Sequence, residues 1–493
     1  MIYLWQLFYF HGKMKFKLTI FLVLSLQWIS CKKQVKEVDI PNIVFLLVDD
    51  LGYMDLGCYG STFYETPHID QLAKEGMLFT EAYAAAAVCS PTRASILTGK
   101  YPSRVNITDW IPGYDPKDKP LLGAEDLDEL PHEEETLAEY LKELGYVNGF
   151  IGKWHLGGEG FFPQDQGFDI NIGGHAAGQP ASYFYPYKND RKFWDVPGLE
   201  GGKEGEYLTD RLTDEAITFM DDNKENPFFL YFCYYNVHTP IQAKDSLIGK
   251  YQMKLKVGYE SPDDVADHDA FTKVKQDNPT YAAMIHSVDE SVGRIMDYLK
   301  DIGKENNTII IFTSDNGGLT TLGTAGRAPT SVRPLRAGKG WLYEGGIKVP
   351  ALIKYPKKIP AGTKSDDLLI SMDYFPAIAE LIGGEIPQMP LDGIGLTNVF
   401  DQKKLAPRNL YWHFPHYHGS KNRPVSAVRS GDFKLMHWHE DDKLELYDLV
   451  NDPSENNDLS EEMISQTDSL KLLLENWKNE INASMPSKNP EYK

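Results

Sequence analysis

The chain of 493 residues is 42% hydrophobic, which suffices for one large domain and a smaller one with buried cores. Its formal net charge of -21 argues against nucleic acid as a partner, because a protein that binds a phosphate backbone needs a basic surface. An anionic substrate would therefore need a local cationic pocket.

The N-terminal segment has the layout of an export signal. Lysines precede an apolar run at residues 18–30, which ends at Cys31 and gives way to polar residues. The run is short for a membrane span, and Cys31 resembles the acylated cysteine of bacterial lipoproteins. We therefore expect a signal over residues 1–31, with Met14 as an alternative start, and a polar tether over residues 32–40. Acylation predicts a periplasmic or outer-membrane protein that touches the membrane only through its lipid; ordinary cleavage and an uncleaved anchor are the alternatives.

Four apolar runs have the composition of strands that are buried on both faces. They cover residues 42–50, 146–155, 226–238 and 307–317. The segments between them have helical periodicity, at residues 135–145, 207–222 and 281–303. This order predicts an α/β fold in which a large, mostly parallel central sheet is flanked by helices.

Each of the four strands ends in polar residues of catalytic types. In parallel sheets, ligands bind beyond the carboxyl ends of the strands, so these side chains should meet at one edge. The residues concerned are Asp49, Asp50, Lys153, His155, His238, Asp315 and Asn316.

The pattern changes after about residue 400. Three segments resemble strands joined by turns, and residues 464–481 have the periodicity of a helix. We predict a catalytic domain over residues 41–400, with a small α+β domain over residues 401–493 packed against it.

Cys58, Cys89 and Cys233 are the cysteines after the tether, so no disulfide framework is expected. We interpret Cys58 and Cys233 as structural thiols. Cys89 precedes Ser90 and Pro91, which favour a helix start and would place the thiol at the positive helix end. That position lowers a thiol pKa and favours oxyanions, although a capped helix after an incidental cysteine is the alternative.

The stretch Cys-Ser-Pro-Thr-Arg at residues 89–93 resembles the motif Cys-x-Pro-x-Arg of the formylglycine-dependent sulfatases, members of the alkaline-phosphatase superfamily. Further stretches carry the resemblance, among them LLVDDLGYMDLGCYG, TPHIDQLAKEG, GKWHLG, NVHTP, TSDNGG and LRAGKGWLYEGGIKVP. The similarity runs from about residue 40 into the C-terminal region. It extends to bacterial polysaccharide sulfatases and to arylsulfatase A-like and N-acetylgalactosamine sulfatases, and it implies an alkaline-phosphatase-like fold.

The resemblance implies that a formylglycine-generating enzyme oxidises Cys89 to formylglycine, whose hydrated aldehyde is the nucleophile. It also implies one Ca²⁺ per chain, held by Asp49, Asp50, Asp315, Asn316 and an oxygen of the modified Cys89. Carboxylate and amide oxygens suit such a hard cation. By the family pattern, Arg93 and His155 hold the hydrate, while Lys153, His238 and Lys339 contact the sulfate. Lys339 or His238 would protonate the leaving oxygen, and Asp315 would accept a proton from the nucleophile.

The substrate is expected to be a sulfated polysaccharide or oligosaccharide, such as algal ulvan or carrageenan, or a glycosaminoglycan. Segments rich in histidine and aromatic residues could contact the sugar, and His175, His413 and His416 are the candidates. Packing between the two domains is the alternative role for these side chains. The alternatives for the whole protein are a phosphomonoester or phosphonate hydrolase of the same superfamily and a non-catalytic glycan-binding surface lipoprotein with unmodified Cys89.

Overall fold

Strand β1 (Asn42–Val48) lies inside the main sheet because its side chains from Ile43 onward are apolar on both faces and all seven residues are buried. It pairs in parallel with β10 (Thr308–Ser314) and with β7 (Phe228–Cys233). Strand β5 (Val147–Gly152) pairs in parallel with β7. The four apolar runs predicted to form strands therefore lie side by side as strands.

The computed structural model describes residues 40–492 except 191, 193–195 and 388. The predicted signal, Cys31 and the tether up to residue 39 lie outside these residues. Within them, the main sheet has eight strands in the order β13-β2-β12-β10-β1-β7-β5-β6. Its outer strands are β6 (Ile170–Ile172), β12 (Ala351–Lys354), β2 (Met77–Phe79) and β13 (Thr363–Ser365). Strand β12 runs antiparallel to both neighbours and the other pairs are parallel, which confirms the mostly parallel α/β sheet.

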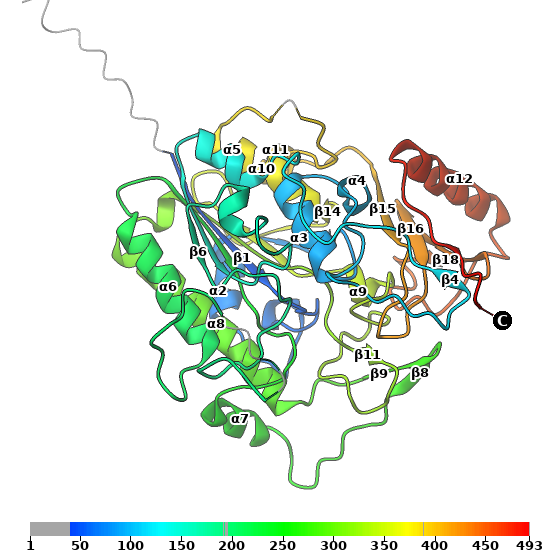
Figure 1. Cartoon of the computed structure of the whole chain (residues 1–493), viewed down its shortest axis with the longest axis horizontal. Coiled ribbons are helices and arrows are strands. Elements are labelled where there is room, and N and C mark those ends of the chain that lie inside the picture. Colours follow the sequence, from blue (N-terminus) through cyan, green and yellow to red (C-terminus); the bar gives the residue numbers. More distant parts are fainter. Residues whose placement is uncertain (1–39, 191, 193–195, 388, 493) are drawn as a thin grey trace, which may run out of the picture. The chain divides into compact units, whose positions relative to one another are not determined.

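Helices cover both faces of this sheet (Figure 1). On one face, Val44 and Leu46 of β1 pack with α2, α6 and α8, whereas Phe45 and Leu47 pack with α3, α5 and α10 on the other. This alternation follows from the two-residue period of a strand. The six helices are α2 (Pro67–Glu75), α6 (Leu208–Asp222), α8 (Pro279–Asp301), α3 (Cys89–Thr98), α5 (Leu137–Glu143) and α10 (Tyr374–Ile382).

The C-terminal region forms an antiparallel sheet in the order β15-β16-β17-β18, with helix α12 against it. Their bounds are β15 (Asn409–Phe414), β16 (Val425–Ser430), β17 (Phe433–Trp438), β18 (Lys443–Asp448) and α12 (Ile464–Glu480). The predicted strands and helix of this region are confirmed. Trp412 and Trp438 lie in one apolar core with Tyr83 and Trp341, and residues 41–493 form one compact unit.

A buried ion-pair network joins this sheet to the segment that carries Lys339. Lys434 of β17 lies 3.0 Å from Glu344 and 2.6 Å from Glu455. Glu455 also accepts a hydrogen bond of 2.7 Å from the backbone N–H of Glu344. Because these charges are buried and paired, they hold the segment around residue 344 in one position.

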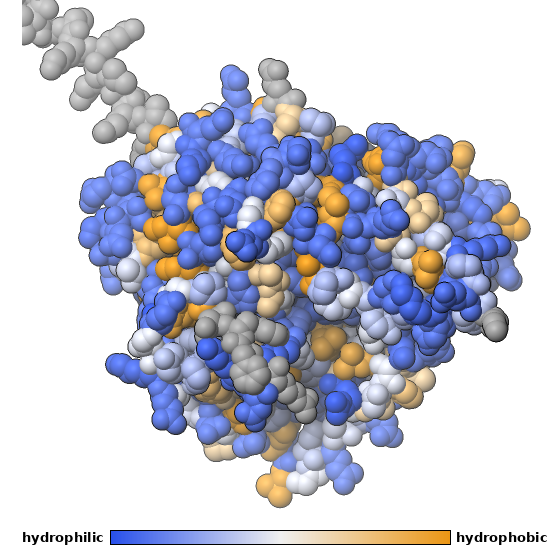
Figure 2. Space-filling model, viewed as in Figure 1, coloured by the Kyte–Doolittle hydropathy of each residue, from blue (hydrophilic) through white to orange (hydrophobic). Residues whose placement is uncertain are grey.

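The remaining elements are short. They are α4 (Pro102–Val105), α7 (Asp245–Gln252), α9 (Glu344–Ile347), α11 (Thr397–Phe400), β3 (Ala82–Tyr83), β4 (Leu121–Leu122), β8 (Val265–Asp267), β9 (Ala270–Thr272), β11 (Thr321–Leu322), β14 (Leu369–Ile370) and β19 (Ser487–Lys488). The face seen in Figure 2 is mostly hydrophilic, with apolar residues scattered over it. Among the described residues, no helix combines the length and apolar content that crossing a bilayer requires.

Candidate active site

The carboxyl ends of the central strands bring charged side chains together. Asp49 follows β1, and both of its carboxylate oxygens accept hydrogen bonds from Lys153 Nζ, which follows β5, at 2.8 and 2.9 Å. Asp315 follows β10 and accepts from Arg93 of α3 through Nε at 2.9 Å, with the Nη2 of Arg93 at 2.8 Å. All four side chains are almost fully buried. The residues that follow these strands therefore lie together at one edge of the sheet, as predicted.

Asp50 organises a second group beside the first. Its carboxylate lies 2.8 Å from Lys339 Nζ, and it accepts a hydrogen bond of 2.8 Å from Asn316 Nδ2. His238 Nε2 lies 3.8 Å from the same carboxylate. Asp50 has a φ of 60°, a conformation that is uncommon for residues other than glycine and that turns its side chain toward this group.

Cys89 is the first residue of α3 and is only 2% exposed. Its Sγ lies 3.2 Å from His155 Nδ1. The other ring nitrogen, Nε2, lies 2.5 Å from the carbonyl oxygen of Ile111, which can only accept, so Nε2 carries the proton. His155 Nδ1 is therefore an acceptor aimed at residue 89.

Ser90 has a different role from the one its position suggested. The residue before the helix is Val88, which supplies no side-chain cap, and Ser90 lies inside α3. The Ser90 hydroxyl donates to the carbonyl oxygen of His155 at 2.9 Å and accepts from the backbone N–H of Ile111 at 3.2 Å. Ser90 thus fixes His155 and the loop around Ile111 to the helix that carries Cys89.

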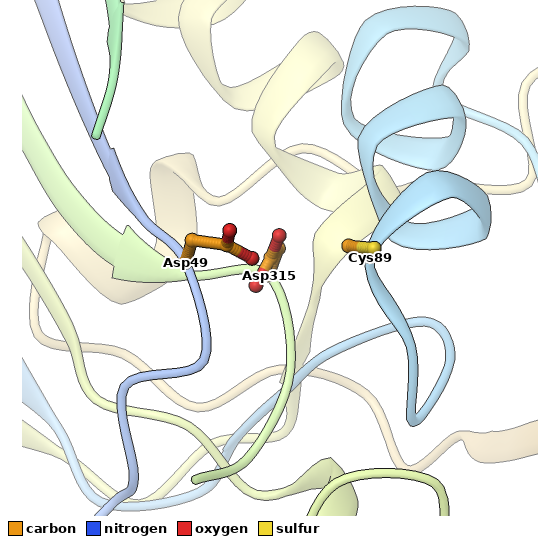
Figure 3. Close-up of side chains that lie close together, drawn as sticks. All are labelled: Asp49, Cys89 and Asp315. Atoms are coloured by element: carbon orange, nitrogen blue, oxygen red, sulfur yellow. The ribbon is translucent and has the colours of Figure 1, made fainter. Parts of the chain in front are cut away.

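A cation could be held between the first strand ends and Cys89. Ligand atoms of Asp49, Asp315 and Cys89 lie within 4.8 Å of one another, and Figure 3 shows the two carboxyl groups side by side with Cys89 at the helix start. Asn316 Oδ1 is buried and has no hydrogen-bond donor among the described residues. A buried amide oxygen without a donor is costly, so a ligand at this point would satisfy it.

The electrostatic balance differs among the three aspartates. Burial, together with the neighbouring carboxylates, holds the pKa of Asp49 well above its ordinary value despite Lys153. Burial also opposes ionisation of Asp50, but Lys339, His238 and Lys153 together outweigh it, so the pKa of Asp50 lies below its ordinary value. The pKa of Asp315 is lowered in the same way, because the arginine of α3 and the two lysines of the site together outweigh burial.

Histidines at the site are held neutral. Burial, and next the charge of Lys339, lowers the pKa of His238 to about 3 and that of His418 to about 3. Burial and Lys153 lower the pKa of His155 well below its ordinary value. The cationic charge of the site therefore resides on lysines and arginine.

A cavity of about 570 Å³ opens onto these residues. It is lined by Asp50, Cys89, His155 and Lys339, which are buried, and by His238. Its remaining wall is largely apolar and includes Trp110, Ile111, Pro112, Tyr114, Leu319 and Leu322. The cavity can therefore take an anionic group at its inner end and a bulkier, partly apolar group beside it.

The structure does not bring His413 and His416 to this cavity. His413 Nδ1 lies 2.6 Å from Ser426 Oγ, and its Nε2 lies 2.8 Å from the carbonyl oxygen of Ser484. His416 Nε2 lies 2.8 Å from Thr108 Oγ1. Both rings are packed inside the protein, which corrects the expected position of these two side chains.

His175 lies behind the reaction centre. Its carbonyl oxygen accepts from the backbone N–H of His155 at 3.3 Å, and its Nδ1 accepts from that of Ala177 at 3.0 Å. It lines a neighbouring cavity of about 460 Å³. Its ring therefore supports the loop at residues 176–179, which does reach the main cavity.

Sequence reasoning missed His418, Trp110 and Tyr114, which line the cavity. The signal for His418 was the Gly-Ser pair that follows it. Such a pair is typical of a turn, in which side chains no longer alternate as they do in a strand. The signal for the aromatic pair was Asp109, whose buried carboxylate accepts from the backbone N–H groups of Trp110 at 2.8 Å and Tyr114 at 3.0 Å.

Residues 41–384 match the family model described as Sulfatase, and residues 337–482 match the model described as N-sulphoglucosamine sulphohydrolase, C-terminal. The chain belongs to the sulfatase family. The resemblance drawn from its motifs is thereby confirmed, and its enzyme class is that of the sulfuric ester hydrolases.

Named sulfatases are similar over most of the chain. N-acetylgalactosamine-6-sulfatase of Sus scrofa is 32% identical over 422 residues, which cover 81% of this sulfatase and 72% of the relative. A sulfatase of Formosa agariphila is 29% identical over 500 residues, which cover 86% of this chain and 85% of the relative. The crystal structure of Ps i-CgsB in complex with k-i-k-neocarrahexaose has a TM-score of 0.72 at 29% identity and covers 92% of this chain and 94% of that one.

Proposed function

We propose that this sulfatase removes sulfate from a sulfated polysaccharide or its oligosaccharides, with a formylglycine made from Cys89 and a bound Ca²⁺. The observation that carries the proposal is the position of Cys89. It lies 3.2 Å from the unprotonated nitrogen of His155, in the cavity that Lys339 and His238 also line. A hydrolase needs a nucleophile, a base and cationic groups within reach of one substrate atom, and this cavity offers all three.

The donor set fits a hard divalent cation. Asp49, Asp50 and Asp315 would supply carboxylate oxygens, and Asn316 an amide oxygen that lacks a donor among the described residues. Oxygen ligands of this kind suit Ca²⁺ or Mg²⁺ better than zinc once an oxygen replaces the sulfur of Cys89. When bound, the cation supplies positive charge that polarises an S–O bond of the ester. The choice of Ca²⁺ rests on the family resemblance.

A formylglycine-generating enzyme is the partner that this proposal requires during maturation. The hydrated aldehyde supplies one hydroxyl that accepts the sulfuryl group and a second whose deprotonation expels sulfate and restores the aldehyde. A thiol could not do this, because it has no hydroxyl left to expel the sulfate. His155 Nδ1 accepts a hydrogen bond from a hydroxyl at residue 89, because its other nitrogen is held by Ile111. Arg93 orients Asp315, which accepts a proton from the attacking hydroxyl.

Lys339 is the group that receives the sulfate. Lys339 lines the cavity and carries a full charge, since the negative groups around it, Asp50 first, together outweigh burial and raise the pKa of Lys339. His238 Nδ1 lies 2.9 Å from the carbonyl oxygen of Thr239, so its Nε2 faces the sulfate as an acceptor until a proton arrives. Lys153, held by Asp49, adds positive charge behind residue 89. Lys339 is therefore the better placed of the two groups to protonate the leaving oxygen.

A sulfated carbohydrate is the substrate class that the cavity wall and the relatives support. Trp110 and Tyr114 offer aromatic faces on which a sugar ring can stack. The relatives include an N-acetylgalactosamine-6-sulfatase and a structure bound to a neocarrahexaose. We further propose export through the N-terminal signal, with acylation at Cys31 and a periplasmic or outer-membrane location.

The test is sulfate release by the protein produced together with a formylglycine-generating enzyme. Carrageenan, ulvan and glycosaminoglycan oligosaccharides are the substrates, with phosphate monoesters and a phosphonate ester as controls. The proposal predicts sulfate release from at least one oligosaccharide, dependent on added Ca²⁺, and faster than any phosphoryl turnover. Faster phosphoryl turnover, or binding of the sugars without release, would contradict it.

A further inference from the structure

His418 occupies a place in the cavity wall that the residues assigned above do not explain. It follows β15 and lines the cavity together with Lys339 and Ser420. A Cβ atom on Gly340, the residue after Lys339, would lie 2.1 Å from His418 Nδ1 and 2.6 Å from its Cε1. The imidazole is therefore packed directly against the backbone that carries Lys339.

The orientation of this ring is set by its own loop. The backbone N–H of Ser420 donates to His418 Nδ1 at 3.2 Å, and the Ser420 hydroxyl lies 2.7 Å from the same nitrogen. The loop is closed by backbone hydrogen bonds between His418 and Asn422 at 3.1 Å and between Lys421 and His418 at 2.9 Å. Ser420 and Asn422 are buried, so the ring cannot turn without breaking these contacts.

This geometry decides which nitrogen carries the proton. A backbone N–H can only donate, so His418 Nδ1 is the acceptor and the proton of the neutral ring resides on Nε2. Nε2 has no hydrogen-bond partner among the described residues, which leaves it for a molecule in the cavity. His238 has the reverse arrangement, because its Nδ1 faces the carbonyl oxygen of Thr239. Of these two cavity histidines, His418 alone offers a neutral N–H donor.

We propose that His418 is a specificity-determining residue that donates a hydrogen bond from Nε2 to a hydroxyl oxygen of the sulfated sugar ring. The inference rests on the proposed carbohydrate substrate. Lys339 receives the sulfate, and His418 packs against Gly340, the next residue along the chain. The Nε2 donor of His418 therefore lies where the sugar ring that bears the sulfate would be. Trp110 and Tyr114 offer aromatic faces, and Gln179 and Thr239 are further polar residues of the cavity wall. His418 differs from them because its ring packs against the backbone that carries Lys339, which places its donor beside the sulfate-binding lysine.

The experiment compares a substrate that has sugar hydroxyls with one that has none. Wild type, His418→Ala and His418→Gln are assayed with 4-nitrophenyl sulfate, with k-i-k-neocarrahexaose and with N-acetylgalactosamine 6-sulfate. Loss of one hydrogen bond predicts that His418→Ala lowers kcat/KM about tenfold for the carbohydrate that wild type hydrolyses, mainly through KM. Turnover of 4-nitrophenyl sulfate should stay within about twofold. Glutamine, which keeps an N–H donor, should restore most of the loss.

His416→Gln is the matched control, because this neighbouring histidine is buried against Thr108 and does not line the cavity. It should leave the ratio of the two activities unchanged. Wild-type activity of His418→Ala on both substrates would overturn the assignment. An equal loss on both substrates would also overturn it, because it would mean that His418 only supports Lys339. Wild type that hydrolyses 4-nitrophenyl sulfate and none of the carrageenan, ulvan and glycosaminoglycan oligosaccharides would contradict the carbohydrate substrate itself, and with it the role of His418.

Discussion

Gly178 tests whether the position of His155 controls the reaction. A Cβ atom at residue 178 would lie 2.2 Å from His155 Cε1 and 2.6 Å from both ring nitrogens. Carbon atoms in contact are about 3.5 Å apart, so Gly178→Ala must push the imidazole or the loop away by about 1.3 Å. The hydrogen bonds that link His155 to residue 89 and to Ile111 cannot survive such a shift unchanged.

A displacement of about 1 Å in a catalytic group lowers turnover about 100-fold, which is the loss that we expect in kcat for Gly178→Ala. The assay is sulfate release from 4-nitrophenyl sulfate by protein with formylglycine at residue 89, with thermal unfolding as a check on folding. Gly158→Ala is the matched control, because its Cβ would lie 3.8 Å from the nearest neighbouring atom, the Cβ of Ala176. A Gly178→Ala variant with wild-type kcat would refute the role given to His155.

Three further predictions concern stability and the cation. Burial raises the pKa of Asp55 to about 7 from 3.8, so its contribution to stability is complete below pH 4 and is lost as the pH rises through 7. The unfolding free energy of Asp55→Asn relative to wild type should therefore rise by about 4 kcal/mol between pH 4 and pH 8, and a flat difference in urea unfolding would contradict this. Trp412→Ala should cost about 3–5 kcal/mol, because the ring is buried and its Nε1 donates to the carbonyl oxygen of Ala84 at 2.8 Å; a loss below about 1 kcal/mol would argue against this packing. Ca²⁺ at 100 times its Kd should stabilise the protein by about 2.7 kcal/mol, and Asn316→Ala should remove most of that gain, whereas equal gains in both proteins would place the ion elsewhere.

The strands and their charged ends were predictable because the signal is local. Residues 42–48 and 308–314 are mainly apolar, with uninterrupted apolar runs at 43–48 and 309–312, and such a run needs cover on both faces wherever it lies. The next residues, Asp49 and Asp315, then meet at the carboxyl edge by the geometry of parallel strands. Helix α8 was predicted for the same reason, since the helical spacing of its apolar residues can be recognised without knowing what the helix packs against.

The cavity wall was not predictable from local pattern. Strand β15 ends at Phe414, and beyond it the direction of a side chain no longer follows alternation. His416 is buried against Thr108 while His418, two residues later, lines the cavity, because Ser420 closes a turn between them and the next strand. The helix start predicted around residues 89–91 is confirmed, but the Ser90 hydroxyl bonds His155, 65 positions away, and does not cap its own helix.

The most direct test of the account is whether activity follows the chemical state of residue 89. Samples produced with graded amounts of a formylglycine-generating enzyme are analysed by mass spectrometry of the peptide that contains Cys89, and sulfate release is measured on the same samples. The account predicts that specific activity rises in proportion to the fraction of formylglycine and is absent when Cys89 is fully unmodified or replaced by alanine. Equal activity in samples with and without the aldehyde would contradict it.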